Sequence, residues 1–357
     1  MTSWDGQSRR DVLEPIVSMD RTRIAAILEE RKEPAFRMRQ IDDAIYIQKV
    51  ARFSDITTLS KPLRDALTNE PTLTLEPSHT AESKDGTIKV LFKLLDGKEI
   101  EAVMIPNKEF RTICVSSQVG CAMKCGFCAT GTMGFTRNLT TDEIVDQVLY
   151  FERLLLSRGL GEKVTNVVFM GMGEPLQNLE AVLPAVERMN DEHGLGLGAR
   201  RISISTCGIV PGILKLADYP MQVNLAVSLH APNDEVRNKI MPVNKAYSID
   251  KLMSACKVYL EKTNRKLFVE YVMLRGINDT PELARELAEL LRPFVPLVQV
   301  NLIPFHQTFF TWKPTPRSEI ERFQEMVLAE GVPCTIRHSA GLDIAAACGQ
   351  LANQRID

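Results

Sequence analysis

The chain has 357 residues, of which 45% are hydrophobic and 25% charged, and its net charge is −2. This composition is that of a globular protein and excludes a disordered or fibrous chain, and the small net charge excludes a uniformly basic nucleic-acid-binding domain. The longest apolar runs, 164–172 and 295–304, are shorter than the roughly 20 residues that cross a bilayer, so we expect no membrane segment.

The first seventy or so residues predict a small helical domain. Asp20 is a suitable N-cap for a helix over residues 21–30, and a second period of apolar residues runs from Ile41 to Val50. We therefore expect a helical accessory domain over residues 1–72.

The pattern then changes to β-rich runs. Residues 87–94 and 99–105 alternate in hydrophobicity and are joined by a turn at Asp96-Gly97. They predict a β-hairpin, which we place in a linker segment over residues 73–110.

From residue 111 to 351 the chain alternates β-rich runs with amphipathic helical periods. The expected strands are 164–170, 201–206, 222–228, 267–273, 298–303 and 333–337. This alternation is typical of parallel strands with helical crossovers, and the number of units favours an α/β fold with a partial (β/α) barrel as the catalytic domain. Functional side chains of such folds lie at the carboxyl ends of the strands.

The location of the protein decides how its eight cysteines are interpreted. The polar, mixed-charge start of the chain, Met1–Val12, fits neither a secretory signal nor a transit peptide, so we expect a cytoplasmic protein. Cytosolic thiols are kept reduced, which favours metal binding or catalysis over a disulfide scaffold.

Cys121, Cys125 and Cys128 place three thiols within eight residues. Structural zinc normally takes four ligands in paired sets, and no second pair lies nearby, so zinc is the weaker alternative. Three thiolates can hold three irons of a 4Fe–4S cluster and leave the fourth iron open, whereas an electron carrier normally provides four cysteines. An open iron can bind a further ligand.

This spacing resembles that of the radical S-adenosylmethionine (SAM) superfamily. There the open iron binds the amine and carboxylate of SAM, and an electron from the cluster cleaves SAM to a 5′-deoxyadenosyl radical. The runs 114–121 and 128–139 are similar to those of the RlmN/Cfr family of RNA adenosine methyltransferases. Further matching segments, which extend the resemblance over essentially the whole chain, are 36–40, 171–175, 203–206, 228–233 and 347–351.

The resemblance implies how an adenine ring carbon, which is a poor nucleophile, is methylated. One of two SAM molecules per turnover methylates Cys348, and the second supplies a radical that removes hydrogen from this methyl group, whose carbon then adds to adenine. Cys114 resolves the adduct by forming a disulfide with Cys348, and Glu101 takes the ring proton. Without the resemblance, a strand Glu is usually solvated and a free cysteine is usually structural.

The resemblance also implies the SAM-binding residues. Glycines around position 173 let the backbone approach a ligand, and Glu174 receives a cationic amine, although the residues alone could form only a tight turn. The full set is Gly173, Glu174, Ser205, Ser228, Leu229, His230 and His306. His306 stands where the family usually has Asn. Three other cysteines match no motif, and we expect them in the core: Cys207, Cys256 and Cys334.

The implied substrate is one adenosine in the peptidyl-transferase region of 23S rRNA, and for the C2-methylating enzymes often a tRNA anticodon-loop adenosine as well. The run 132–138 favours these enzymes over the C8-methylating resistance enzymes. We expect the helical domain to bind the RNA and the target adenine to flip out of its base stack. We expect a flavodoxin or ferredoxin to donate the electrons. The basic residues expected at phosphates are Arg31, Lys32, Arg37, Arg39, Arg200, Arg201, Arg265 and Lys266.

Two other classes of protein stay open at this point. A glycyl-radical activase shares the cluster but does not require Cys348 or the helical domain. A non-enzymatic iron–sulfur or zinc RNA-binding module would not cleave SAM when it is reduced.

Overall fold

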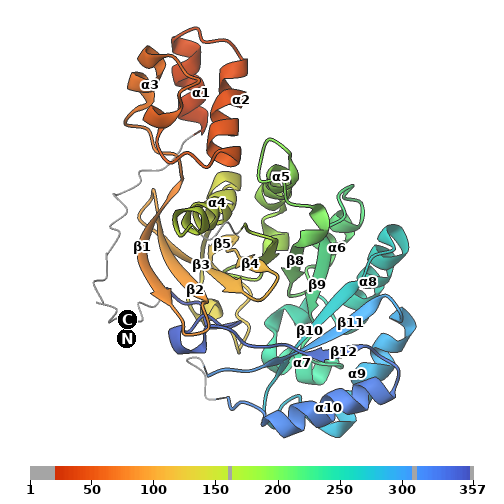
Figure 1. Cartoon of the computed structure of the whole chain (residues 1–357). Helices are drawn as coiled ribbons and strands as arrows, with labels where there is room; N and C mark the ends of the chain where they lie inside the picture. Colours follow the sequence, from red (N-terminus) through yellow and green to blue (C-terminus); the bar gives the residue numbers. More distant parts are fainter. Residues whose placement is uncertain (1–20, 160–162, 308–311, 354–357) are drawn as a thin grey trace, which may run out of the picture.

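A computed structural model of the chain describes residues 21–159, 163–307 and 312–353 (Figure 1). Its centre is a ten-stranded sheet with the order β1-β2-β3-β4-β7-β8-β9-β10-β11-β12. Neighbouring strands from β4 to β12 are parallel, whereas those from β1 to β4 are antiparallel. Within the described ranges β1 and β12 stay unpaired with each other, so the sheet is an open, partial barrel, as the sequence predicts.

The parallel part alternates strands with helices along the chain. Its strands are β4 (Arg111–Cys114), β7 (Asn166–Phe169), β8 (Ile202–Thr206), β9 (Asn224–Ser228), β10 (Leu267–Met273), β11 (Val298–Pro304) and β12 (Cys334–Ile336). The helices are α4 (Thr141–Ser157), α5 (Leu179–Asn190), α6 (Val210–Ala217), α7 (Asp234–Ile240), α8 (Ile249–Thr263), α9 (Pro281–Leu291) and α10 (Arg317–Ala329). Most of these helices lie along the outside of the curved sheet (Figure 1). The six strands expected from the sequence are all present.

Short elements complete this part of the molecule. A small two-stranded sheet pairs β5 (Gln118–Gly120) with β6 (Phe135–Asn138). The single-turn helices are η3 (Ala129–Thr132), η4 (Pro175–Gln177), η5 (Ala199–Arg201), η6 (Pro242–Lys245), η7 (Arg292–Phe294) and η8 (Leu342–Ile344). No helix in the described part of the chain has both the length and the apolar character needed to cross a bilayer.

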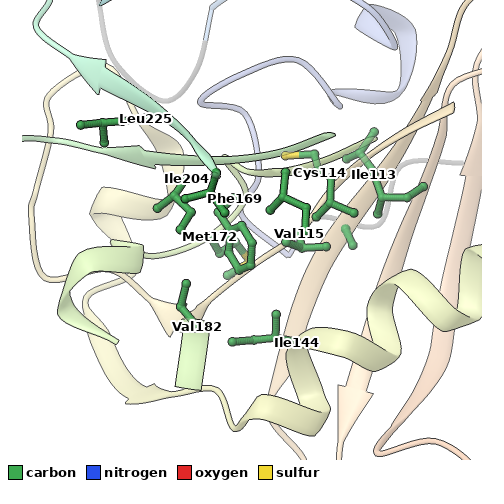
Figure 2. Close-up of a cluster of buried hydrophobic side chains, with 14 of the residues drawn as sticks. Ile113, Cys114, Val115, Ile144, Phe169, Met172, Val182, Ile204 and Leu225 are labelled. Atoms are coloured by element: carbon green, nitrogen blue, oxygen red, sulfur yellow. The ribbon is translucent and has the colours of Figure 1, made fainter. Parts of the chain in front are cut away.

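The core between the sheet and the helices is apolar. Figure 2 shows a part of it in which Phe169 of β7, Ile204 of β8 and Leu225 of β9 lie on the side of the sheet, and Ile144 of α4 and Val182 of α5 lie on the side of the helices. These side chains are fully buried, and burying each contributes roughly 1.5–3 kcal/mol relative to exposure. The core thereby fixes the strands whose carboxyl ends carry the site.

The antiparallel strands extend this sheet at its β4 edge. They are β1 (Leu75–Glu82), β2 (Ile88–Leu94) and β3 (Glu99–Pro106). The predicted hairpin is β2–β3, with Gly97 at φ +76° in its turn. Because Val103 of β3 pairs with Cys114 of β4, the hairpin is continuous with the barrel sheet.

The helical region stands apart from the sheet in Figure 1. It consists of α1 (Arg21–Glu30), α2 (Phe36–Asp42), the π-helical turn η1 (Asp43–Ile47), η2 (Phe53–Asp55) and α3 (Lys61–Leu67). Ile24, Ile41 and Leu63 are buried within it. The predicted N-cap Asp20 lies outside the described residues, and the domain limits at residues 72 and 110 stay predictions.

A buried carboxyl on α4 should make stability depend on pH. Asp146 Oδ2 accepts hydrogen bonds from Thr74 N at 2.6 Å and Thr74 Oγ1 at 2.8 Å, and burial raises its pKa to about 7. The carboxyl group of an Asp in the unfolded chain has a pKa of about 3.9. The folded protein therefore binds the Asp146 proton more tightly than the unfolded chain does. The resulting stabilisation is complete below the unfolded pKa and is lost as the pH rises through about 7.

We therefore expect Asp146→Asn to flatten the pH dependence of stability. Urea unfolding at about pH 5 and about pH 8 should show the wild type losing stability relative to the variant by a few kcal/mol. The exposed Asp250 of α8 provides the control, and Asp250→Asn should leave the wild-type pH dependence unchanged. Parallel pH curves for wild type and Asp146→Asn would contradict the expectation.

Candidate active site

A cavity lies at the carboxyl ends of the parallel strands. It is lined by Cys121, Met123, Cys125, Phe127, Cys128, Phe169, Met170, Gly171, Gly173, Glu174, Pro175, Ser205, Thr206, Cys207, Ser228, His230, Met241, Glu270, Val272, Ile303, Phe305, Cys348 and Gly349. Most of the predicted site residues are therefore brought together here. Four others, all described by the structure, are not among the lining residues: Glu101, Cys114, Leu229 and His306.

The three clustered cysteines lie on the loop between β5 and β6. Backbone hydrogen bonds hold the loop: Cys121 N donates to Gly134 O at 2.8 Å, and Cys128 N donates to Cys125 O at 3.1 Å. Burial raises the pKa of Cys121 to about 12 and raises those of Cys125 and Cys128 as well. The charges of the other two thiolates raise the pKa of Cys125 further, so the three sulfurs are close neighbours.

Three neighbouring thiols fit a cationic iron–sulfur cluster, because cluster binding replaces their protons and neutralises the thiolates. A structural zinc site would need a fourth ligand in addition to these three cysteines.

Glu174 presents a buried carboxylate beside these thiols. Its Oε2 accepts Cys207 N at 2.7 Å and its Oε1 accepts Leu176 N at 3.0 Å. Burial raises its pKa, and its charge in turn raises the pKa of Cys121 and Cys125. A carboxylate that has neutral backbone donors around it and faces a cavity can receive the cationic amine of SAM.

Gly173 has no space for a side chain. Its φ is +101°, and a Cβ atom at this position would lie 2.5 Å from the Gln118 Cβ. The next residue is fixed by the same partner, because Glu174 N donates to Gln118 Oε1 at 2.8 Å. Glycine is therefore required by packing against the β5 strand, which places Glu174 at the cavity.

We expect Gly173→Ala to weaken both stability and SAM binding. Gly97 is a matched control, because it also has positive φ, +76°, but no atom lies within 4 Å of its would-be Cβ. Gly97→Ala should lower the free energy of unfolding only by the left-handed backbone penalty of about 1–2 kcal/mol. Gly173→Ala should lower the free energy of unfolding by more than this and should reduce SAM affinity at least about tenfold. Urea unfolding and equilibrium SAM binding measure the two effects, and equal losses in both variants would contradict the clash.

The segment after β9 is held by a buried arginine. Arg237 donates to Leu229 O at 3.0 Å, to Ser228 O at 3.3 Å and to Cys207 O at 2.7 Å. It thus ties the carboxyl end of β9 to that of β8. The side chain of Leu229 is buried in the core, and its backbone N–H donates to Glu270 O at 3.1 Å. Sequence reasoning missed Arg237, whose role depends on contacts between strands.

His230 has a left-handed backbone, with φ +59°. Its Nδ1 accepts Val272 N at 3.0 Å, and its ring makes an edge contact with Phe127 at a centroid distance of 4.7 Å. Burial lowers its pKa to about 3, which keeps the imidazole neutral. It therefore offers the cavity an uncharged surface that adjoins the cluster loop.

Cys348 and Cys114 are close enough to interact electrostatically. Cys348 is exposed at the cavity, yet the protein around it and the charge of Glu270 raise its pKa to about 11. Burial raises the pKa of Cys114, and the charge of Cys348 raises it further. Figure 2 shows Cys114 at the edge of the core, with its sulfur pointing away from Ile144 and Val182. Both thiols are free.

Glu101 and His306 lie outside the cavity lining. Glu101 is fully buried and forms an ion pair with Lys89, whose Nζ is 3.0 Å from Glu101 Oε1. The Nε2 of His306 lies 2.6 Å from Ser339 Oγ, and burial lowers the pKa of this half-buried imidazole. Neither residue is among those that line the cavity, so their roles stay predictions.

The expectation for the remaining cysteines needs one correction. Cys256 and Cys334 are buried in α8 and β12 as expected. Cys207 is also buried, but it lines the cavity and its N–H binds Glu174. Its position directly after β8 is a signal that the sequence offered, because strand ends carry the site. Glu270 of β10 was likewise missed, and it lines the cavity near Cys348.

The basic residues expected to contact RNA divide into two groups. Arg31, Lys32, Arg37 and Arg39 belong to the helical region, as expected. Arg200, Arg201, Arg265 and Lys266 directly precede or begin at the amino ends of β8 and β10. The cavity lies at the opposite, carboxyl ends, so this second group is remote from the cavity, and its contact with RNA phosphates stays a prediction. Arg201 instead stacks over the Phe110 ring.

Comparison with known proteins agrees with this geometry. Residues 115–288 match the family described as "Radical SAM superfamily", and residues 15–72 match "Ribosomal RNA large subunit methyltransferase N-terminal domain". A crystal structure of a radical SAM methyltransferase from Sphaerobacter thermophilus superposes with a TM-score of 0.88 at 44% identity, and the match covers 95% of this chain and 100% of that one.

Two curated relatives are named "Probable dual-specificity RNA methyltransferase RlmN". The protein from Listeria welshimeri is 42% identical, over 94% of this chain and 92% of its own length. The protein from Enterococcus faecalis is 40% identical, over 96% of this chain and 97% of its own length.

A partial barrel with three cysteines on one loop at its cavity defines a radical SAM enzyme, and such enzymes use a 4Fe–4S cluster and SAM. Within that class, the chain belongs to the RlmN family of methyltransferases. The resemblance stated from the sequence is thereby confirmed.

Proposed function

We propose that this enzyme methylates C2 of one adenosine in the peptidyl-transferase region of 23S rRNA, and an adenosine in the tRNA anticodon loop. The names of the relatives support RNA as the substrate class. The observation that carries the chemistry is the placement of Cys348, which lines the same cavity as the cluster cysteines. A simple SAM methyltransferase would have no need of such a thiol.

The cluster and SAM supply the 5′-deoxyadenosyl radical when they are bound. Cys121, Cys125 and Cys128 would hold the cluster, and Glu174 and the backbone at Gly173 would orient SAM together with Ser205, Ser228 and His230. The Leu229 backbone and His306 complete the proposed set. We infer that two SAM molecules are used per turnover and that a flavodoxin or ferredoxin donates the electron.

Cys348 carries the methyl group in this proposal. Its raised pKa keeps the thiol protonated at neutral pH. Because the thiolate is the nucleophilic form, the protonated thiol is protected from other reactions until SAM is bound. After the methylene carbon has joined the adenine, Glu101 accepts the proton of the ring carbon and the adduct gives up one electron, for which the bound cluster would be the acceptor. The Cys114 thiolate then attacks the Cys348 sulfur, the carbon–sulfur bond breaks with its electron pair on the carbon, this carbon takes up a proton to become the methyl group, and a disulfide forms.

The first test is mass spectrometry of adenosines from the 23S rRNA and tRNA of a strain that lacks the gene. Complementation with the wild type should restore 2-methyladenosine, and complementation with Cys348→Ala should not. Cys334→Ala, which removes a buried thiol away from the cavity, should restore it as the wild type does.

Other outcomes of this test separate the alternatives. Restoration of 8-methyladenosine would show that the enzyme belongs with the resistance class. Restoration of neither base would show that the RNA target is wrong.

A further inference from the structure

The segment that carries Cys348 is hydrogen-bonded to the antiparallel part of the sheet, at the β1–β2 turn and at the start of β3. Residues 341–353, which we call the Cys348 segment, follow β12 and reach these strands from the other end of the sheet. Gly341 N donates to Asp85 Oδ2 at 2.9 Å, and Asn353 Nδ2 donates to Glu99 O at 2.8 Å. Both ends of the segment are therefore fixed, with Cys348 between them.

The cluster loop holds the middle of the same segment. Ala129 N donates to Gly349 O at 2.7 Å, and Thr130 Oγ1 donates to Leu351 O at 2.7 Å. These two contacts place the methyl-carrying cysteine next to the loop of Cys121, Cys125 and Cys128, and they define a closed arrangement of the segment.

One buried ion pair contacts the segment on both sides of Cys348. Lys89 Nζ lies 3.0 Å from Glu101 Oε1 and donates to Ala345 O at 3.3 Å. Glu101 Oε2 accepts the two N–H groups of residues 352–353, at 2.8 and 3.1 Å. The two charged side chains are 2% and 0% exposed, so the segment seals them from water.

The sheet register brings this pair together. Glu101 of β3 lies opposite Leu91 of β2, so Lys89 is its diagonal neighbour on the same face. The rest of β2 is apolar except for the exposed Lys93. An ion pair buried in such a strand is often no more stable than an apolar pair of similar volume, so packing alone gives no reason for Lys89. Its contacts with the Cys348 segment do.

We propose that Lys89 is a positioning residue, which forms with Glu101 a clamp that holds the Cys348 segment closed and has to release it before Glu101 accepts the ring proton. This inference rests on the proposed function of Glu101 and Cys348. In the proton transfer the ring C–H bond breaks, its electron pair stays with the ring, and an O–H bond forms on Glu101.

The closed arrangement disfavours that transfer. Glu101 Oε2 is occupied by two N–H donors, so this oxygen is already engaged while the segment is closed. Glu101 is also shielded from the cavity, since it is fully buried and is not a lining residue. Release of the segment removes the donors and opens the path, while Lys89 keeps the carboxylate in place.

Hydrogen exchange of the SAM-free protein tests the clamp. In Lys89→Met, backbone amides of residues 341–353 should exchange about tenfold faster than in the wild type, because a charge-assisted contact is lost. Lys93→Met, which changes the same residue type on the same strand at an exposed position, should exchange as the wild type does. Unchanged exchange in Lys89→Met would overturn the proposal.

A second readout separates positioning from a structural role. Lys89→Met should still become methylated at Cys348, as peptide mass spectrometry reports, while its yield of methylated RNA falls about tenfold because the base is misplaced. An equal loss of both methylations would overturn the positioning role.

If Lys89→Met does not fold, the paired variant Lys89→Met with Glu101→Gln removes both charges and leaves no buried ion unpaired. It should show the same faster exchange in the Cys348 segment, and wild-type exchange would again overturn the clamp. The exchange experiment involves no RNA, so a failure of the proposed function in the complementation test is distinguished from a failure of the clamp.

Discussion

Replacement of Cys114 by alanine should leave the enzyme covalently joined to its RNA. The Cys348 thioether should still add to adenine, but the proposed resolving thiol is missing and the carbon–sulfur bond is not broken, so each protein molecule should complete at most a single addition. Denaturing gel electrophoresis should show a slower RNA-containing band, and nuclease digestion followed by peptide mass spectrometry should locate the modified nucleoside on Cys348.

The control for this variant is Cys256→Ala, which also removes a fully buried thiol but one that lies in α8. It should turn over repeatedly and accumulate no adduct. Multiple turnovers by Cys114→Ala would contradict the role of Cys114 and would indicate another resolving nucleophile.

Removal of one cluster cysteine should abolish the radical step altogether. In Cys125→Ala only two of the three clustered thiols remain, and a 4Fe–4S cluster with one open iron needs three. We expect the anaerobically reconstituted variant to lose the visible iron–sulfur absorption, and we expect no 5′-deoxyadenosine after reduction in the presence of SAM. Cys125 lies on a loop between short strands, so the barrel should keep its unfolding transition.

Cys334→Ala serves as the control for cluster loss, because it removes a thiol from β12. It should bind the cluster and cleave SAM at the wild-type rate. Cleavage of SAM by Cys125→Ala would contradict the ligand assignment. A cluster-loaded wild type that does not cleave SAM would contradict the enzyme class itself.

The sequence predicted the parallel strands well, because buried parallel strands are continuous apolar runs that end at turn residues. It missed β1, since Pro77 and the polar residues after it resemble a loop. The structure explains this pattern: β1 is an edge strand with a register irregularity between Pro77 and His79, and proline is tolerated at such positions. The short strand β4 was also missed, although it carries Cys114.

The candidate site was predictable where a local motif carries it, as for Cys121, Cys125 and Cys128. Contacts that depend on strand register were not predictable. The sequence gives no sign that Lys89 meets Glu101, or that Arg237 binds the carbonyl groups at two strand ends. The position of Arg200 and Arg265 at the amino ends of β8 and β10 could not be predicted for the same reason, because local charge does not tell which end of a strand faces the cavity.

The β3–β4 pairing, which joins the antiparallel strands to the parallel part of the sheet, limits where members of the family can differ in the ring carbon that they methylate. Glu101 lies two residues before Val103 on β3, and Val103 pairs with Cys114 of β4, so both side chains stand on one face of the sheet. A slip of β3 by one residue would turn Glu101 to the other face, so the strand pairing fixes the spacing between the proposed proton acceptor and the proposed resolving thiol. A change in which ring carbon receives the methyl group would then have to arise outside these strands, in the peptide around Cys348.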